Sequence, residues 1–252
     1  MGRRHVARKR NHTARPPTPS SLSQACHSSW PCFHTVFSFL FFCVCVCVYW
    51  VLPMKRDLVK AAASGNIKNL RSLLDEGVDA NVPRKKGWTP LCAAAFQGHI
   101  HCLRALLQAG ALVDKADDRG YTPLLCAATF GSLACVLELV RAGTDVNAVS
   151  REGHTALSLA AELNKVNCVH ALIAAGATVD KRATNGQTPL VRASSAGHLD
   201  VVEALLEAGA DMTISDDLGD TALTLATKKK HRHVVYLLNG ADGRPRKRLR
   251  QA

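Results

Sequence analysis

Residues 188–211 read TPLVRASSAGHLDVVEALLEAGAD, and this stretch carries the signals that decide the fold. Thr188 suits the residue that caps the start of a helix, because its hydroxyl can accept a hydrogen bond from an unpaired backbone N–H. Pro189 suits the first helical position, where no donor is needed. Gly197 and Gly209 suit helix ends, where glycine adopts the left-handed conformation readily. The stretch therefore predicts two short helices in succession.

The same signals recur along the chain at a constant spacing of 33 residues, and each threonine is followed by Pro or Ala and then Leu. The five threonines are Thr89, Thr122, Thr155, Thr188 and Thr221. A glycine stands two residues before each of them, as a turn with positive φ requires. Between the two helices, Asn164 and Lys230 replace glycine in two copies, and asparagine tolerates the left-handed region better than lysine does.

Apolar residues recur in the same register. Small residues occupy one position of every first helix, where close approach of a stacked neighbour leaves no room for more: Ala94, Ala127, Ala160, Ala193 and Ala226. Paired apolar residues such as Leu106 and Leu107 fill the second helix. No single unit could bury these faces alone, whereas stacking buries them. We therefore expect an all-α repeat solenoid of stacked helix–turn–helix units with hairpin loops.

The pattern T-P-L-x-x-A-A, followed by G-H-x-x-V-V-x-x-L-L-x-x-G-A-D, resembles the ankyrin repeat, and the resemblance spans Met54 to about Gly240. It implies an N-terminal capping repeat at 54–86, four full repeats at 87–218 and a C-terminal capping repeat at 219–240. The histidine usual in the family after T-P-L is absent, so local hydrogen bonding there is expected to differ. Its place is taken by Cys92, Leu125, Ser158, Val191 and Thr224.

The resemblance also implies where a partner protein binds, namely on the hairpin tips and the exposed face of the first helix. Carried onto this chain, those positions are Lys86, Trp88, Phe96, Gln97, Arg119, Tyr121, Thr129, Phe130, Glu152, His154, Glu162 and Leu163. The four aromatic residues among them predict a binding hot spot. In the alternative, Phe96 and Phe130 fold back onto adjacent helices and only complete the core. Further along, Asp216, Asp217 and Asp220 predict an acidic end of the binding groove; in the alternative, these surface acids serve only solubility.

The net charge of +12 is unevenly distributed. Residues 1–53 carry six Lys or Arg and no acid, and residues 228–252 carry nine against Asp242, which leaves 17 bases and 19 acids between them. A near-neutral body argues against a nucleic-acid groove in the repeats. The expected partner is a protein, bound by a monomeric scaffold.

No catalytic, cofactor or metal site is expected. Cys102, Cys135 and Cys168 share one register, but packed layers lie about 10 Å apart, whereas thiolates sharing a zinc need bonds near 2.3 Å. We expect core cysteines, which suit a reducing compartment. Asn147, and more weakly Asn81, resembles the hairpin asparagines that asparaginyl hydroxylases modify in ankyrin proteins. The alternative is an asparagine that only forms the turn.

The N-terminal segment 1–53 contains an uncharged run at 36–52, which is 17 residues long and at the lower limit for a membrane span. A cleaved signal peptide is discarded, because 35 residues precede the run. A membrane anchor fits the length and gives a membrane-tethered protein as the alternative function, although the basic side lies at 1–35 and would place the repeats outside the cytosol. We favour a third explanation, that 1–53 is upstream sequence and the protein starts at Met54.

The C-terminal segment 241–252 is expected to be a disordered basic tail. Its dense basic run resembles a nuclear localisation signal, and a solvated tail without that role is the alternative. The basic residues are Arg244, Arg246, Lys247, Arg248 and Arg250. A nuclear localisation signal predicts location in the cytoplasm, the nucleus or both. The membrane-tethered alternative predicts location at a membrane.

Overall fold

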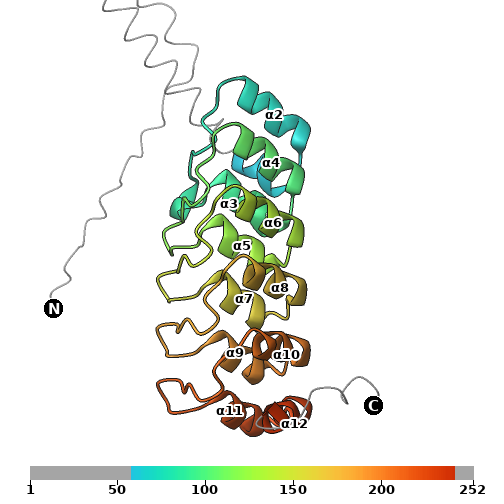
Figure 1. The fold of residues 1–252 in the computed structure, drawn as a ribbon. Helices are drawn as coiled ribbons and strands as arrows, with labels where there is room; N and C mark the ends of the chain where they lie inside the picture. Colours follow the sequence, from blue (N-terminus) through green and yellow to red (C-terminus); the bar gives the residue numbers. More distant parts are fainter. Residues whose placement is uncertain (1–57, 242–252) are drawn as a thin grey trace, which may run out of the picture. The chain divides into compact units, whose positions relative to one another are not determined.

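The computed structural model describes residues 58–241 of the chain, which form a stack of helix pairs connected by hairpin loops (Figure 1). A helical segment at 58–63 comes first. The elements that follow are α2 (Ile67–Asp75), the 3₁₀ turn η2 (Lys85–Gly87), α3 (Pro90–Gln97), α4 (Ile100–Gln108), α5 (Pro123–Phe130), α6 (Leu133–Arg141), α7 (Ala156–Glu162), α8 (Val166–Ala174), α9 (Pro189–Ala196), α10 (Leu199–Glu207), α11 (Ala222–Lys228) and α12 (Arg232–Ala241). This architecture confirms the predicted all-α repeat solenoid.

The first helix of each repeat begins where the threonine spacing predicts. Thr89 Oγ1 accepts a hydrogen bond from the backbone N–H of Cys92 at 3.1 Å, and the other four threonines cap their helices in the same way. At Thr155 the cap is reciprocal, because Ser158 Oγ accepts from the backbone N–H of Thr155 at 3.0 Å. Ser158 stands at the position of the usual family histidine, and its hydroxyl makes the second contact of this cap.

The turn between the two helices uses the left-handed backbone region in every repeat. Gly98 ends α3 with φ of 74°. At the equivalent places, Asn164 and Lys230 have φ of 56° and 63°, as the sequence register predicts. Lys230 is therefore a bulky L-residue in a region that favours glycine.

The core is continuous along the stack. The first helices α3, α5, α7, α9 and α11 pack against one another in order, and α4, α6, α8, α10 and α12 form a second layer beside them. The predicted row of small residues lies between neighbouring first helices with no exposed surface: Ala94, Ala127, Ala160, Ala193 and Ala226. The second helices contribute Leu106, Leu139, Leu172 and Leu205, which are equally buried.

Three histidines connect a repeat to the one before it. Nε2 of His99 lies 3.1 Å from the carbonyl oxygen of Ala63, and His231 contacts the carbonyl of Ser195 at the same distance. His198 makes the same contact with the carbonyl of Glu162, at 2.9 Å. These histidines, which have no metal-ligand spacing in the sequence, therefore have a structural role between repeats.

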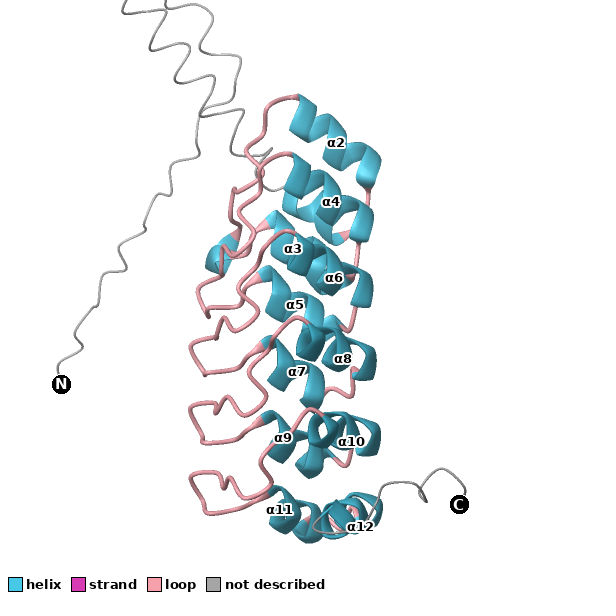
Figure 2. Ribbon diagram, viewed as in Figure 1, coloured by secondary structure: helices cyan, strands magenta, loops and turns pink. Residues whose placement is uncertain are grey.

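The hairpin loops lie together on one side of the helix stack (Figure 2). Each hairpin is bound to the previous one through the backbone: Asp118, Arg151, Thr184 and Asp217 donate their N–H to the carbonyls of Lys86, Arg119, Glu152 and Asn185, at 3.0, 2.9, 3.1 and 3.3 Å. We call this series the hairpin ladder. It holds the loops in a common register.

The first hairpin differs from the second for a local reason. In the second hairpin, Asp117 Oδ1 accepts hydrogen bonds from the backbone N–H of Arg119 and Tyr121, at 2.9 and 2.8 Å. Arg84 occupies the equivalent position in the first hairpin and offers no acceptor. The turn there takes another form, in which Lys86 has φ of 64°.

No helix between residues 58 and 241 is both long enough and apolar enough to cross a bilayer. The predicted leader 1–53, with its apolar run 36–52, lies outside the described residues, as does the tail beyond residue 241. The predicted repeat boundaries at 54–86, 87–218 and 219–240 stay predictions.

Candidate functional site

The candidate site is the inner face, by which we mean the surface formed by the hairpins and the exposed sides of α3, α5, α7, α9 and α11. Every predicted partner-binding residue belongs to one of these segments. None of the five threonine-capped helices exceeds eight residues. The face is therefore built from short helix ends and turns, whose side chains differ between repeats while the backbone repeats.

Trp88 and Phe96 form an aromatic pair at the first full repeat. Their ring centroids lie 5.9 Å apart and the rings meet edge to face, at an interplanar angle of 76°. Trp88 is half-buried and packs against the core, whereas Phe96 remains 38% exposed. Trp88 thus supports Phe96, and the Phe96 side chain is the part of the pair that solvent or a partner can reach.

Phe130 and Tyr121 are placed separately from this pair. Phe130 is 47% exposed, and its ring lies over Gly98 of the previous repeat, so close that a Cβ at Gly98 would come within 2.6 Å of Phe130 Cε1. Tyr121 is half-buried and lines a pocket toward the next repeats. The four aromatic side chains therefore do not form one cluster, although both phenylalanines keep exposed surface. Their role in binding stays a prediction.

The polar members of the predicted set are mostly exposed. Lys86, Gln97 and Arg119 are exposed on the inner face. Thr129 is half-buried, and its hydroxyl donates to the carbonyl of Leu125 at 2.8 Å. This hydroxyl is therefore already paired within its own helix. The three exposed side chains offer groups that can exchange hydrogen bonds with water for hydrogen bonds with a partner.

An open pocket of about 510 Å³ lies on the inner face, between the repeats capped by Thr155 and Thr188. It contains two contacts to carboxylates: His154 Nε2 lies 3.2 Å from Glu152 Oε2, and Arg192 Nη1 donates to Glu162 Oε2 in an ion pair. The full lining is Tyr121, Glu152, His154, Leu159, Glu162, Leu163, Thr184, Asn185 and Arg192. Five of these nine residues belong to the partner-binding set predicted from sequence: Tyr121, Glu152, His154, Glu162 and Leu163.

The groups in the pocket influence one another electrostatically. Burial lowers the pKa of His154, the charge of Arg192 lowers it further, and Glu152 and Glu162 act in the opposite direction. Burial also raises the pKa of Tyr121, as does the negative charge of Glu152. His154 is therefore neutral at pH 7, and its Nε2–H faces the carboxylate of Glu152.

Arg192 is a charged pocket residue that sequence reasoning missed. It lies four residues after its capping threonine, and only 8% of its side chain is exposed. The signal was present, because the equivalent positions in the other repeats are small or apolar: Ala93, Cys126, Leu159 and Leu225. A charged residue in an otherwise apolar register is a departure that needs a partner, which Glu162 supplies.

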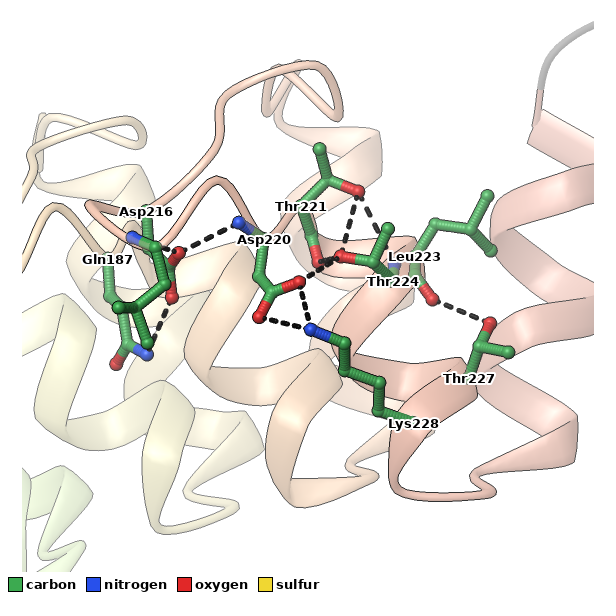
Figure 3. Close-up of polar contacts among 9 residues, drawn as sticks. Gln187, Asp216, Asp220, Thr221, Leu223, Thr224, Thr227 and Lys228 are labelled. Carbon is green, nitrogen blue, oxygen red and sulfur yellow. Dashed lines mark hydrogen bonds and ion pairs between the residues drawn. The ribbon is translucent and has the colours of Figure 1, made fainter.

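The predicted acidic end is wrong for Asp216 and Asp220, whereas the Asp217 side chain is 58% exposed. Asp216 and Asp220 are only 6% and 9% exposed, and Asp217 Oδ1 lies 3.2 Å from Arg182 Nη2. Lys228 Nζ lies 2.6 and 2.8 Å from the two carboxylate oxygens of Asp220 (Figure 3). The acids are paired within the chain because the last hairpin needs them as hydrogen-bond acceptors.

Asp216 illustrates this structural use (Figure 3). Burial by itself would raise its pKa, but hydrogen bonds from the backbone N–H of Asp220, the amide of Gln187 and the backbone N–H of Leu218 lower it, with help from the charge of Lys228. The three bonds measure 2.9, 3.4 and 3.0 Å. The net pKa is lowered, so this carboxylate stays ionised and holds the hairpin.

The cysteines of the described region are buried and free: Cys92, Cys102, Cys126, Cys135 and Cys168. Burial raises the pKa of the Cys102, Cys135 and Cys168 thiols, which disfavours the thiolate that a metal requires. From residue 58 to residue 241, no group of three or more His, Cys, Asp or Glu is arranged to hold a metal ion.

Asn147 is exposed and bridges two hairpins. Its Oδ1 accepts from the backbone N–H of Thr178 at 2.7 Å, and its Nδ2 donates to the carbonyl of Gly176 at 3.4 Å. Asn81 makes the equivalent contacts with Leu112 and Gly110, at 2.7 and 3.2 Å. This geometry accounts for an asparagine as a turn-forming residue, and its hydroxylation stays a prediction. The basic residues of the predicted nuclear signal lie outside the described residues.

Among protein-family models, one described as ankyrin repeats (three copies) matches residues 58–150, 139–216 and 157–247. The matched segments together cover more than half of the chain and include the whole described helix stack. A search of the curated proteins found no match.

Proposed function

The chain belongs to the ankyrin-repeat family, whose members generally mediate protein–protein interaction, and from this we propose that it is a non-enzymatic scaffold that binds a partner protein on its inner face. The observation that carries this proposal is the exposed aromatic surface of Phe96 and Phe130 on an inner face that also exposes Lys86, Gln97 and Arg119. Apolar rings surrounded by polar groups are typical of interface centres.

The rigidity of the inner face also supports the proposal. The hairpin ladder and the capped helices hold the face without a ligand, so little conformational entropy has to be lost when a partner binds. Trp88 fixes Phe96, and Gly98 provides the surface on which Phe130 rests. Surface complementarity is the mechanism in this proposal, and it makes or breaks no covalent bond.

Cross-linking of the full chain to its partners in cell extract, followed by mass spectrometry, tests the proposal. We expect Phe96→Ala and Phe130→Ala to reduce capture of the partner by at least about fivefold, because truncating a hot-spot side chain costs more than roughly 1 kcal/mol. Tyr236→Ala is the matched control, since Tyr236 is 69% exposed on α12, away from the inner face. Equal capture by both phenylalanine variants and the wild type would contradict the proposal.

Cellular location is a separate proposal. We propose that the scaffold starts at Met54 and enters the nucleus through its basic tail, whose five Arg and Lys residues support import. Intact mass spectrometry of the native protein determines the N-terminal residue, and a start near Met1 would favour the membrane-tethered alternative instead. Alanine at Lys247 and Arg248 is expected to shift a fluorescent full-length chain toward the cytoplasm.

A further inference from the structure

Two carboxylates in the 510 Å³ pocket are held in place by a buried side chain, Arg192, and a half-buried one, His154. Arg192 donates to Glu162 Oε2, and His154 Nε2 contacts Glu152 Oε2. The backbone of Glu152 is fixed as well, because its carbonyl accepts from the N–H and the hydroxyl of Thr184, at 3.1 and 2.9 Å. Both carboxylates are therefore oriented before any partner arrives.

Each carboxylate uses only one of its two oxygens in these contacts. Within residues 58–241, Oε1 of Glu152 and Oε1 of Glu162 have no hydrogen-bond partner. The side chains are 63% and 46% exposed, so both free oxygens can be reached from solvent. Two fixed acceptors at the mouth of one pocket are suited to a donor that carries positive charge.

The charge balance of the pocket agrees with a cationic ligand. The two carboxylates are opposed by one guanidinium, Arg192, which is already paired with Glu162. His154 contributes no charge at pH 7, because burial lowers its pKa. The lining therefore has a net negative charge. An acidic ligand would have to displace Glu162 from Arg192 and would lie beside the uncompensated Glu152.

The walls of the pocket suit the stem of a long basic side chain. Leu163 is 42% exposed, and Leu159 and the Tyr121 ring line the same space. Lysine and arginine bury their methylene stems against apolar surface while the charged end reaches polar groups. The volume of about 510 Å³ lies within the roughly 300–1,000 Å³ of ordinary ligand pockets.

Two side chains of the pocket each keep one buried nitrogen unpaired. Arg192 Nε and His154 Nδ1 have no hydrogen-bond partner among the described residues, although Arg192 is more than nine-tenths buried. Such atoms are rare in native structures and need an explanation. Here the two side chains are positioned by their carboxylate contacts, and each leaves one of its own nitrogens unpaired.

Resting on the proposed function, we propose that this pocket receives an arginine or lysine side chain of the partner protein. The carboxylates of Glu152 and Glu162 bind the charged end through their Oε1 atoms, and Tyr121, Leu159 and Leu163 contact the stem. Arg192 and His154 act as positioning residues, since they orient the carboxylates and do not themselves contact the ligand's charge.

The test uses the full chain and three small probes: N-acetyl-arginine methylamide, its uncharged isostere N-acetyl-citrulline methylamide, and N-acetyl-glutamate methylamide. Methyl NMR resonances of Leu159 and Leu163 report on the pocket. We expect saturable shifts with the arginine probe and about tenfold weaker binding of the citrulline probe, because the charge-assisted hydrogen bonds are lost. Tighter binding of the glutamate probe, or equal binding of the arginine and citrulline probes, would overturn the inference.

Variants connect the binding to the two carboxylates. Glu152→Gln and Glu162→Gln should each weaken binding of the arginine probe roughly three- to tenfold. Glu138→Gln is the matched control, because Glu138 pairs with Arg104 on the outer layer of helices and should leave probe binding unchanged. If Glu162→Gln unfolds the chain because it removes the partner of Arg192, Glu152→Gln still tests the inference, since Glu152 is the more exposed of the two. Unchanged binding by both variants overturns the inference.

The two proposals fail in different ways. If the captured partner binds Glu152→Gln and the wild type with equal affinity, the pocket inference is wrong and the scaffold proposal stands. If the phenylalanine variants capture the partner normally while the arginine probe still requires Glu152 and Glu162, the aromatic surface is not the binding face and the pocket inference stands.

Discussion

Lys230 shows what a single residue contributes in a repeated fold. It has φ of 63° at a position where four other repeats have glycine and one has asparagine. The stack imposes this conformation, because the turn between two helices is determined by the packing of both. The local preference of lysine is overridden by tertiary contacts, which leaves strain of about 1–2 kcal/mol in the last described repeat.

Replacing Lys230 with glycine should therefore stabilise the protein. We expect Lys230→Gly to raise the free energy of unfolding by about 0.5–1 kcal/mol, since relief of strain exceeds the extra freedom that glycine has in the unfolded chain. Asn164→Gly should have a smaller effect, because asparagine tolerates this region. Urea unfolding followed by circular dichroism measures both.

The control for this prediction is Lys229→Gly. Lys229 has φ of −89°, so glycine there adds freedom to the unfolded chain and relieves no strain. It should lower the free energy of unfolding. Stabilisation of the same size in the Lys229 and Lys230 variants would show that the left-handed conformation is not the cause.

At the scale of elements, the junction between neighbouring first helices combines two requirements on Gly98. Its φ of 74° disfavours any side chain, and the ring of Phe130 occupies the space that a Cβ would need. Gly110 has φ of 81°, but no atom lies within 4 Å of the position that a Cβ would take there. Substitutions at the two glycines therefore distinguish the energetic cost of backbone strain from the cost of disturbed packing between repeats.

We expect Gly110→Ala to lower the free energy of unfolding by about 1 kcal/mol, from backbone strain alone. Gly98→Ala should cost about 1–3 kcal/mol more, because the new methyl group displaces Phe130. Chemical denaturation of both variants measures the difference. Adding Phe130→Ala to Gly98→Ala should remove most of the excess, and a persistent excess would show that Phe130 is not its source.

Sequence periodicity predicted the helix starts at Pro90, Pro123 and Pro189, because capping signals act within four residues of one another. It could not predict the contact between Arg192 and Glu162, which lie 30 residues apart and belong to different repeats. It also placed Asp216 and Asp220 on a free surface, because burial of a carboxylate depends on neighbours that a single repeat does not reveal.

For the whole molecule, stability should follow the nearest-neighbour arrangement of the repeats. Contacts between elements join adjacent units, and the central repeats have a neighbour on each side. Such arrays are described by the stability of each repeat and the coupling between neighbours. The ends of the described stack, at 58–63 and α12, should open more easily than the centre.

Hydrogen exchange of the full chain, followed by mass spectrometry, tests this prediction. Amides of α5 to α9 should be the most protected. Leu139→Ala, at a fully buried position of α6, should cost about 2–5 kcal/mol and reduce protection mainly in its own repeat and the two adjacent ones. An equal loss of protection from residue 58 to residue 241 would show instead that the stack unfolds as one unit.

The hairpin ladder has a direction, since every hairpin offers a carbonyl to the N–H of the following one. A duplicated 33-residue unit inserted at any junction would donate an N–H to the carbonyl of the preceding hairpin and offer its own carbonyl to the following hairpin. Copy number, and with it the length of the binding surface, can thus change in evolution by whole repeats while the contacts inside the existing ones are preserved.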